Sequence, residues 1–101
     1  MTLPSGITVP LAAIEEVCRR YSVQELSVFG STARGDFRPE SDIDLLVDFA
    51  PGAKVGLWEF GHLERELQSL FGRKVDLVSK HGLKPRVRRS VLQDAKILYA
   101  A

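Results

Sequence analysis

The sequence has 101 residues, of which 45% are apolar and 27% are charged, with a net charge of +1. This size and composition fit one ordinary globular domain and exclude disordered and fibrous proteins. A single cysteine, Cys18, excludes a disulfide framework and a thiolate zinc cluster. No apolar run approaches the ~20 residues of a membrane span, and the N-terminus lacks the features of a signal peptide. We therefore expect one domain over residues 1–101, located in the cytoplasm and without membrane contact.

The small net charge hides an asymmetry along the chain. Residues 1–72 carry 6 Lys and Arg against 11 Asp and Glu, whereas residues 73–101 carry 8 against 2. The acidic part contains a tight cluster of carboxylates, and the basic part contains the run KPRVRR over residues 84–89. Such a division indicates that one part of the chain handles cations and the other handles anions.

In the first half of the chain, residues 10–21 have apolar side chains at helical spacing and predict an amphipathic helix. Residues 25–29 predict a short strand, which runs into a turn with a short helical piece over 30–35. A polar loop broken by a proline is expected over 37–41. Residues 43–49 predict a second strand, which Ala-Pro-Gly ends.

In the second half, the apolar positions over 56–71, from Leu57 to Leu70, predict a long helix, and 74–79 predict a third strand. Pro85 opens another helical stretch, and 97–99 are either a last short strand or the end of that helix. The alternation of helices and strands predicts an α/β or α+β fold with helices packed on a small mixed sheet.

Three aspartates are candidates for a metal site. Asp42 and Asp44 stand two residues apart at the start of a strand, so their side chains point to the same face. Two carboxylates this close repel each other unless a cation lies between them or one of them stays protonated. Hard oxygen ligands arranged in this way suit Mg²⁺. Asp76 interrupts the apolar third strand. If that strand lies beside the second, Asp76 completes a triad with the other two.

A candidate phosphate-binding turn precedes the aspartates. Gly30 and Ser31 directly follow the first strand and offer backbone N–H groups and a hydroxyl at the start of a short helix. The guanidinium of Arg34, one helical turn later, could clamp a phosphate or could simply pair with Asp36 or Glu40. A metal-binding set of carboxylates that faces a phosphate-binding turn suits two-metal phosphoryl transfer.

These residues carry a resemblance to a known family. Residues 30–44, GSTARGDFRPESDID, resemble the Gly-Ser…Asp-x-Asp signature of the DNA polymerase beta-type nucleotidyltransferase superfamily. The segments GSTARG and SDIDLLV are most similar to its minimal nucleotidyltransferase branch. The resemblance extends over nearly the whole chain and implies the nucleotidyltransferase fold.

The resemblance also implies roles for residues. Asp42, Asp44 and Asp76 would be the catalytic carboxylates that bind two Mg²⁺ ions, with Asp76 as the base for the incoming hydroxyl. Gly30 and Ser31 would bind the triphosphate of ATP. Members of the minimal branch commonly pair with a HEPN-domain protein, often an RNase toxin. The implied function is therefore AMP transfer to a hydroxyl of that partner, most simply a tyrosine, by the antitoxin of a toxin–antitoxin pair.

Two other functions stay open. One is a non-catalytic module that neutralises its partner sterically, although a module without catalysis has no need of three clustered carboxylates. The other is a nucleic-acid-binding module built on residues 80–89, but that segment has few aromatic side chains for base stacking, so direct nucleic-acid binding is not expected. We expect Asp48 to face solvent outside the site and His81 to be an ordinary surface histidine. The basic segment 84–89 would contact either the nucleotide or the partner.

Overall fold

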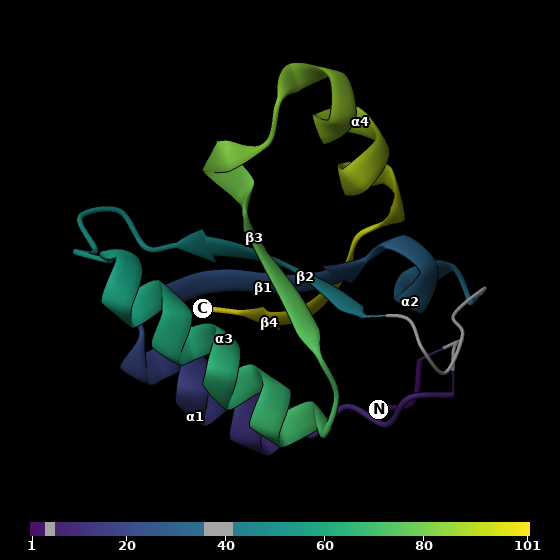
Figure 1. Ribbon diagram of the computed structural model, residues 1–101, viewed down its shortest axis with the longest axis horizontal. Coiled ribbons are helices and arrows are strands. Elements are labelled where there is room, and N and C mark those ends of the chain that lie inside the picture. The colour runs from purple at the N-terminus through teal and green to yellow at the C-terminus, as the bar shows by residue number, and fades with distance from the viewer. Residues whose placement is uncertain (4–5, 36–41) are drawn as a thin grey trace.

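The computed structural model describes residues 1–3, 6–35 and 42–101, and the loop expected over 37–41 lies outside these ranges. Its strands form one mixed sheet in the order β3-β2-β1-β4 (Figure 1). They are β1 (Val23–Phe29), β2 (Ile43–Phe49), β3 (Val75–Ser79) and β4 (Lys96–Ala100). Strands β2 and β3 are parallel, whereas β1 is antiparallel to both β2 and β4. The prediction of a small mixed sheet with helices is confirmed, and residues 97–99 belong to a strand.

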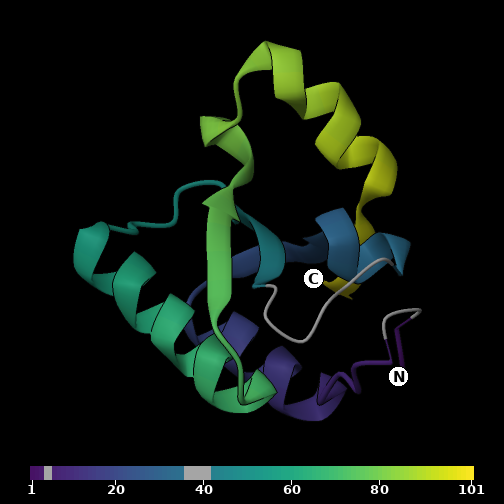
Figure 2. The same cartoon turned by 45° about the vertical axis from the view of Figure 1, so that its right-hand side comes forward.

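Helices lie on both sides of this sheet (Figures 1 and 2). Helices α1 (Leu11–Arg20) and α3 (Leu57–Phe71) pack on one side. Helix α4 (Pro85–Asp94) lies on the other side and follows a short 3₁₀ turn, η1 (Lys80–Gly82). Helix α3 connects β2 to β3, and α4 connects β3 back across the sheet to β4. Because crossovers between parallel strands are right-handed, two crossovers that move in opposite directions place their helices on opposite faces.

Alternation along β2 separates the core from the other face of the sheet. Ile43, Leu45 and Val47 are fully buried and belong to the same apolar cluster as Leu63 and Leu67 of α3. Side chains of a strand alternate between its two faces, so Asp44 and Asp48 point away from this cluster, toward the face that α4 crosses. The core therefore fixes the direction of the carboxylates.

Cys18 is fully buried on the apolar side of α1, as the helical spacing indicates. Burial raises the pKa of its thiol to about 12, because the thiolate would lose its hydration. The thiol therefore stays protonated and acts as a small apolar side chain.

Leu57 lacks the apolar contact expected of it, and helix α4 is exposed along most of its length. Leu57 was expected on the buried stripe of the long helix, but it is 91% exposed. The neighbouring Trp58 is 77% exposed. Both residues lie in the first turn of α3, ahead of the part of the helix that packs on the core. Helix α4 begins at Pro85 as expected, yet none of its residues is buried. Its contacts with α2 and β1 are few, because it crosses the sheet instead of packing along it.

Among the described residues, no helix combines the length and the apolar character that a membrane crossing requires.

Candidate active site

The register of the sheet brings together the residues singled out in the sequence. Asp44 of β2 pairs with Phe29 of β1 on one side and with Asp76 of β3 on the other. Gly30 directly follows Phe29 and opens the short helix α2 (Gly30–Arg34). Neighbouring strands are about 4.8 Å apart, so the Gly30 turn, Asp44 and Asp76 form a row across three adjacent strands. The expectation that the third strand lies beside the second is confirmed.

Asp42 extends this row along the chain. It precedes β2, and the fully buried Ile43 between Asp42 and Asp44 anchors this part of the chain to the core. The Asp42 side chain is partly exposed, and its Oδ2 atom lies 3.9 Å from the ammonium of Lys74. At that distance and exposure the lysine contributes little to holding the carboxylate in place.

Gly30 is in close contact with Asp44. Its φ is +67°, a left-handed conformation that favours glycine, and a Cβ atom at this position would lie 2.6 Å from Oδ2 of Asp44. The turn therefore needs a glycine both for its backbone and for its contact with the carboxylate. Ser31 follows in the first turn of α2 and is half-buried.

The electrostatics of Asp44 reflect these neighbours. Partial burial raises the pKa of the Asp44 carboxyl, and the charges of Asp76 and then Asp42 raise it further. The positive charge of Arg34 acts in the opposite direction on the same pKa. Asp44 is thus a carboxylate in a region of concentrated negative charge, which a bound cation would relieve.

Helix α3 holds the strand segment around Asp76. The backbone N–H of Val75 donates to Oε1 of Gln68, and the N–H of Leu77 donates to Oε2 of Glu64. The distance from nitrogen to oxygen is 3.1 Å in both bonds. These amides face away from β2, at the edge of the sheet, where a strand otherwise leaves N–H groups unpaired. The Asp76 side chain is exposed between them. Nothing in the sequence pattern indicated that Glu64 and Gln68 fix this edge.

Arg34 forms an ion pair with α4. Its Nη1 atom lies 2.8 Å from Oδ2 of Asp94, the last residue of α4. The two alternative partners considered from the sequence, Asp36 and Glu40, lie outside the described residues. Asp94 is 60 positions away from Arg34 in the chain, so no local spacing could have revealed the pair.

Asp48 differs from expectation, whereas His81 lies on the surface as expected, with 77% of its side chain exposed. Only 20% of the Asp48 side chain is exposed, and its Oδ1 atom lies 3.0 Å from Nε2 of His81 in η1. Asp48 is therefore a partly buried partner of His81 and not a solvent-facing residue. The pair lies on the same sheet face as Asp44, four residues further along β2, or about 13 Å at the rise of a strand.

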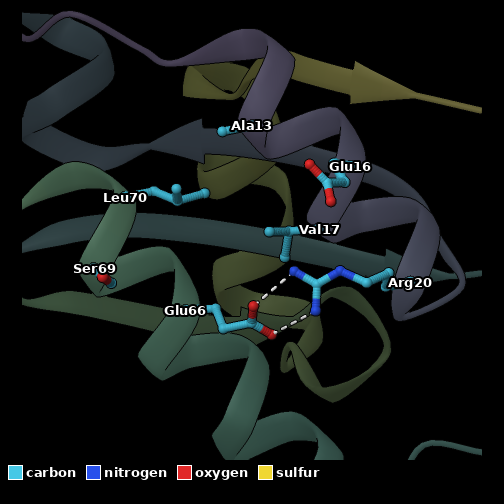
Figure 3. A pocket seen from close by; sticks show the side chains of 7 residues that line it. All are labelled: Ala13, Glu16, Val17, Arg20, Glu66, Ser69 and Leu70. Carbon is cyan, nitrogen blue, oxygen red and sulfur yellow. Dashed lines mark hydrogen bonds and ion pairs between the residues drawn. The ribbon is translucent and has the colours of Figure 1, made fainter.

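The carboxylates are neighbours but are not gathered around one point. Within residues 1–3, 6–35 and 42–101, no set of three or more His, Cys, Asp and Glu side chains is close enough together to hold a metal ion as it stands. A hollow of about 190 Å³ lies elsewhere, between α1 and α3 (Figure 3). Arg20 and Glu66 form an ion pair at its edge, and these helices cover the opposite face of the sheet from the aspartates.

Comparison with known proteins places this geometry in a family. Residues 12–98 match the family described as Nucleotidyltransferase domain. The chain is 38% identical to the protein adenylyltransferase MntA of Thermococcus cleftensis over 94 residues, which cover 93% of both chains. A candidate minimal nucleotidyltransferase of known structure is 42% identical, has a TM-score of 0.73, and is matched over 85% of this chain and 86% of its own.

A third comparison supports the fold alone. A chain from a solved complex, described as the tri-AMPylated HEPN toxin of Shewanella oneidensis with its MNT antitoxin, is 22% identical. Its TM-score is 0.65, over 90% of this chain and 70% of that one. Taken together with the two closer matches, these results show that the chain belongs to the nucleotidyltransferase family and is a nucleotidyltransferase of the minimal, MntA-like type.

Proposed function

We propose that this chain transfers AMP from ATP to a hydroxyl group of a HEPN-domain partner, with Mg²⁺ bound by Asp42, Asp44 and Asp76. The observation that carries the proposal is the row formed by the Gly30 turn, Asp44 and Asp76 across three neighbouring strands. A phosphate-binding turn directly beside paired carboxylates is the arrangement that nucleotidyl transfer requires.

The donor set fits a divalent metal. The three side chains offer only carboxylate oxygens, which Mg²⁺ prefers. Burial first, and then the charges of Asp76 and Asp42, raise the pKa of Asp44, and a bound cation would offset both effects. Like charges repel, so bringing the three carboxylates together costs free energy without a cation. To hold two ions, these side chains would have to turn toward one another. Bound there, Mg²⁺ would neutralise the charge that develops on the transferred phosphoryl group.

The chain's own residues then have distinct tasks. Gly30 lets the backbone approach the triphosphate, and the Ser31 hydroxyl donates to a phosphate oxygen. Asp76, the most exposed of the three carboxylates, accepts the proton of the incoming hydroxyl as its oxygen bonds to the α-phosphorus. The bond between that phosphorus and pyrophosphate breaks in the same exchange.

The partner is inferred from relatives. The similar protein of Thermococcus cleftensis is named a protein adenylyltransferase, and a chain of the same fold belongs to a complex of an AMPylated HEPN toxin with its antitoxin. We infer from these relatives that the chain is the antitoxin of such a pair. A tyrosine as the modified residue is an expectation from the family resemblance alone. The genome should then encode a HEPN-domain protein beside this chain. Location in the cytoplasm stays a prediction from the sequence.

Calorimetric titration with Mg²⁺ and ATP tests the nucleotide site. The wild type should bind both together, whereas Asp42→Asn and Asp44→Asn should lose the magnesium-dependent part of the affinity without loss of folding. Asp76→Asn should abolish transfer. Full transfer by Asp76→Asn would remove that residue from the site.

A further inference from the structure

We propose that Asp94 positions the Arg34 side chain to bind the phosphates of the nucleotide. This inference rests on the proposed function, because it takes nucleotide phosphates as the ligand of the Gly30 turn. Asp94 lies outside both the Gly-Ser and the Asp-x-Asp motifs, 50 positions after Asp44.

The topology explains why Asp94 is in a position to act. Strands β3 and β4 lie at opposite edges of the sheet, so the segment that joins them must cross over β2 and β1. Helix α4 makes this crossing on the side of the sheet away from α1 and α3 (Figures 1 and 2). Its last residue, Asp94, therefore arrives beside α2 just before β4 begins.

The contact joins the two ends of these helices. Arg34 is the last residue of α2, the helix that Gly30 and Ser31 open, and its Nη1 atom is 2.8 Å from Oδ2 of Asp94. The positive charge of Arg34 also acts on Asp44, so the guanidinium is within electrostatic reach of the carboxylate row. A guanidinium has five N–H donors in a planar fork, so it can bond a phosphate oxygen and carboxylate oxygens at the same time.

Fixing the arginine has a physical benefit. An arginine side chain loses conformational entropy when it is immobilised, so a side chain already held in place binds a phosphate more tightly. The pair itself adds little to folding, because 49% of the Arg34 side chain and 28% of the Asp94 side chain are exposed, and solvent screens ion pairs of this kind. Positioning therefore accounts for the contact better than stability does.

A double-mutant cycle on ATP affinity tests the proposal. Calorimetry with Mg²⁺ present would compare the wild type, Asp94→Asn, Arg34→Met and the double variant. We expect Asp94→Asn to weaken ATP binding roughly threefold to tenfold, as coupled neighbours in one charge network do. In the Arg34→Met background the same substitution should have no further effect. Asp94→Glu should recover part of the loss.

A matched control is available on the other face of the sheet. Arg20 and Glu66 also join two helices through an ion pair, at 2.7 Å and with similar exposure (Figure 3). Glu66→Gln should leave ATP affinity unchanged. Melting curves of all variants would show whether any loss of affinity reflects unfolding.

Several outcomes would overturn the proposal. Tighter ATP binding by Asp94→Asn would mean that Asp94 competes with phosphate for Arg34, and additive losses would mean that Asp94 acts without Arg34. Unchanged affinity in Arg34→Met would place the phosphates elsewhere. If AMP transfer is normal but the losses of ATP affinity are additive, only the positioning role of Asp94 is contradicted. If the wild type binds ATP but transfers no AMP, the proposed function is contradicted, and the double-mutant cycle on ATP affinity can still be interpreted.

Discussion

The Oδ2 atom of Asp44 lies 2.6 Å from the point where a Cβ atom on Gly30 would stand. The Asp44 carboxylate of β2 thus occupies the position next to Gly30 that any larger side chain would need, so only a glycine fits in this turn. This contact joins the turn proposed to bind phosphate to one of the aspartates proposed to bind metal, and the first prediction follows from it.

Gly30→Ala should displace the Asp44 carboxylate and abolish AMP transfer. Gly72 is a matched control, because its φ of +65° is nearly that of Gly30 while a Cβ there would meet no atom within 4 Å. Gly72→Ala should therefore lose stability only, by about 1 kcal/mol, through backbone strain. Melting curves and transfer assays on both variants separate strain from crowding. Equal activity of the two variants would show that the contact with Asp44 does not matter.

Asp44→Asn should stabilise the fold at neutral pH in the absence of metal. The pKa of Asp44 is raised in the folded state, so the folded protein binds more protons than the unfolded chain and loses stability as pH rises through that pKa. The asparagine variant avoids this loss. Its gain in melting temperature should be present near pH 7 and vanish below about pH 4, the ordinary pKa of aspartate.

Added Mg²⁺ and ATP should reverse that order. Ligands that bind only the folded state stabilise the wild type, while Asp44→Asn should gain little from them. An Asp44→Asn variant that melts below the wild type without metal at pH 7 would show that burial and the neighbouring charges do not penalise the ionised carboxylate.

Ser31→Ala should weaken ATP binding by about 1–3 kcal/mol, the usual cost of a lost hydrogen bond to a charged group. The fold should be unaffected, because the Ser31 backbone carbonyl, and not its hydroxyl, accepts the bond from Gly35 that closes α2. Ser69→Ala, on the exposed surface of α3, serves as the control. Calorimetry measures both, and an unchanged affinity in Ser31→Ala would place the triphosphate away from this turn.

The sequence predicted the fold and the candidate site because local patterns report them directly. The alternation of Ile43, Asp44 and Leu45 shows which face of the strand is buried, and that is what the structure has. Asp76 could be singled out because a charged residue in an apolar strand is conspicuous. The sequence left open whether its strand lies beside the second one, and the parallel pairing of β2 with β3 answers that question.

Contacts between distant parts of the chain had no such signal. The Arg34–Asp94 pair and the capping of the edge strand by Glu64 and Gln68 depend on how α3 and α4 cross the sheet. Leu57 shows the opposite failure. Its spacing fits the apolar stripe of α3, but the helix begins before it reaches the core, so periodicity alone assigned it a burial that it lacks.

Intact-mass spectrometry of the partner tests the central claim most directly. The HEPN-domain protein encoded beside this chain would be incubated with ATP, Mg²⁺ and either the wild type or Asp44→Asn. The account predicts that the wild type adds the mass of one or more AMP groups and that Asp44→Asn adds none, even while it still binds the partner. A partner that both proteins silence equally, without any change in mass, would contradict the account and favour steric neutralisation.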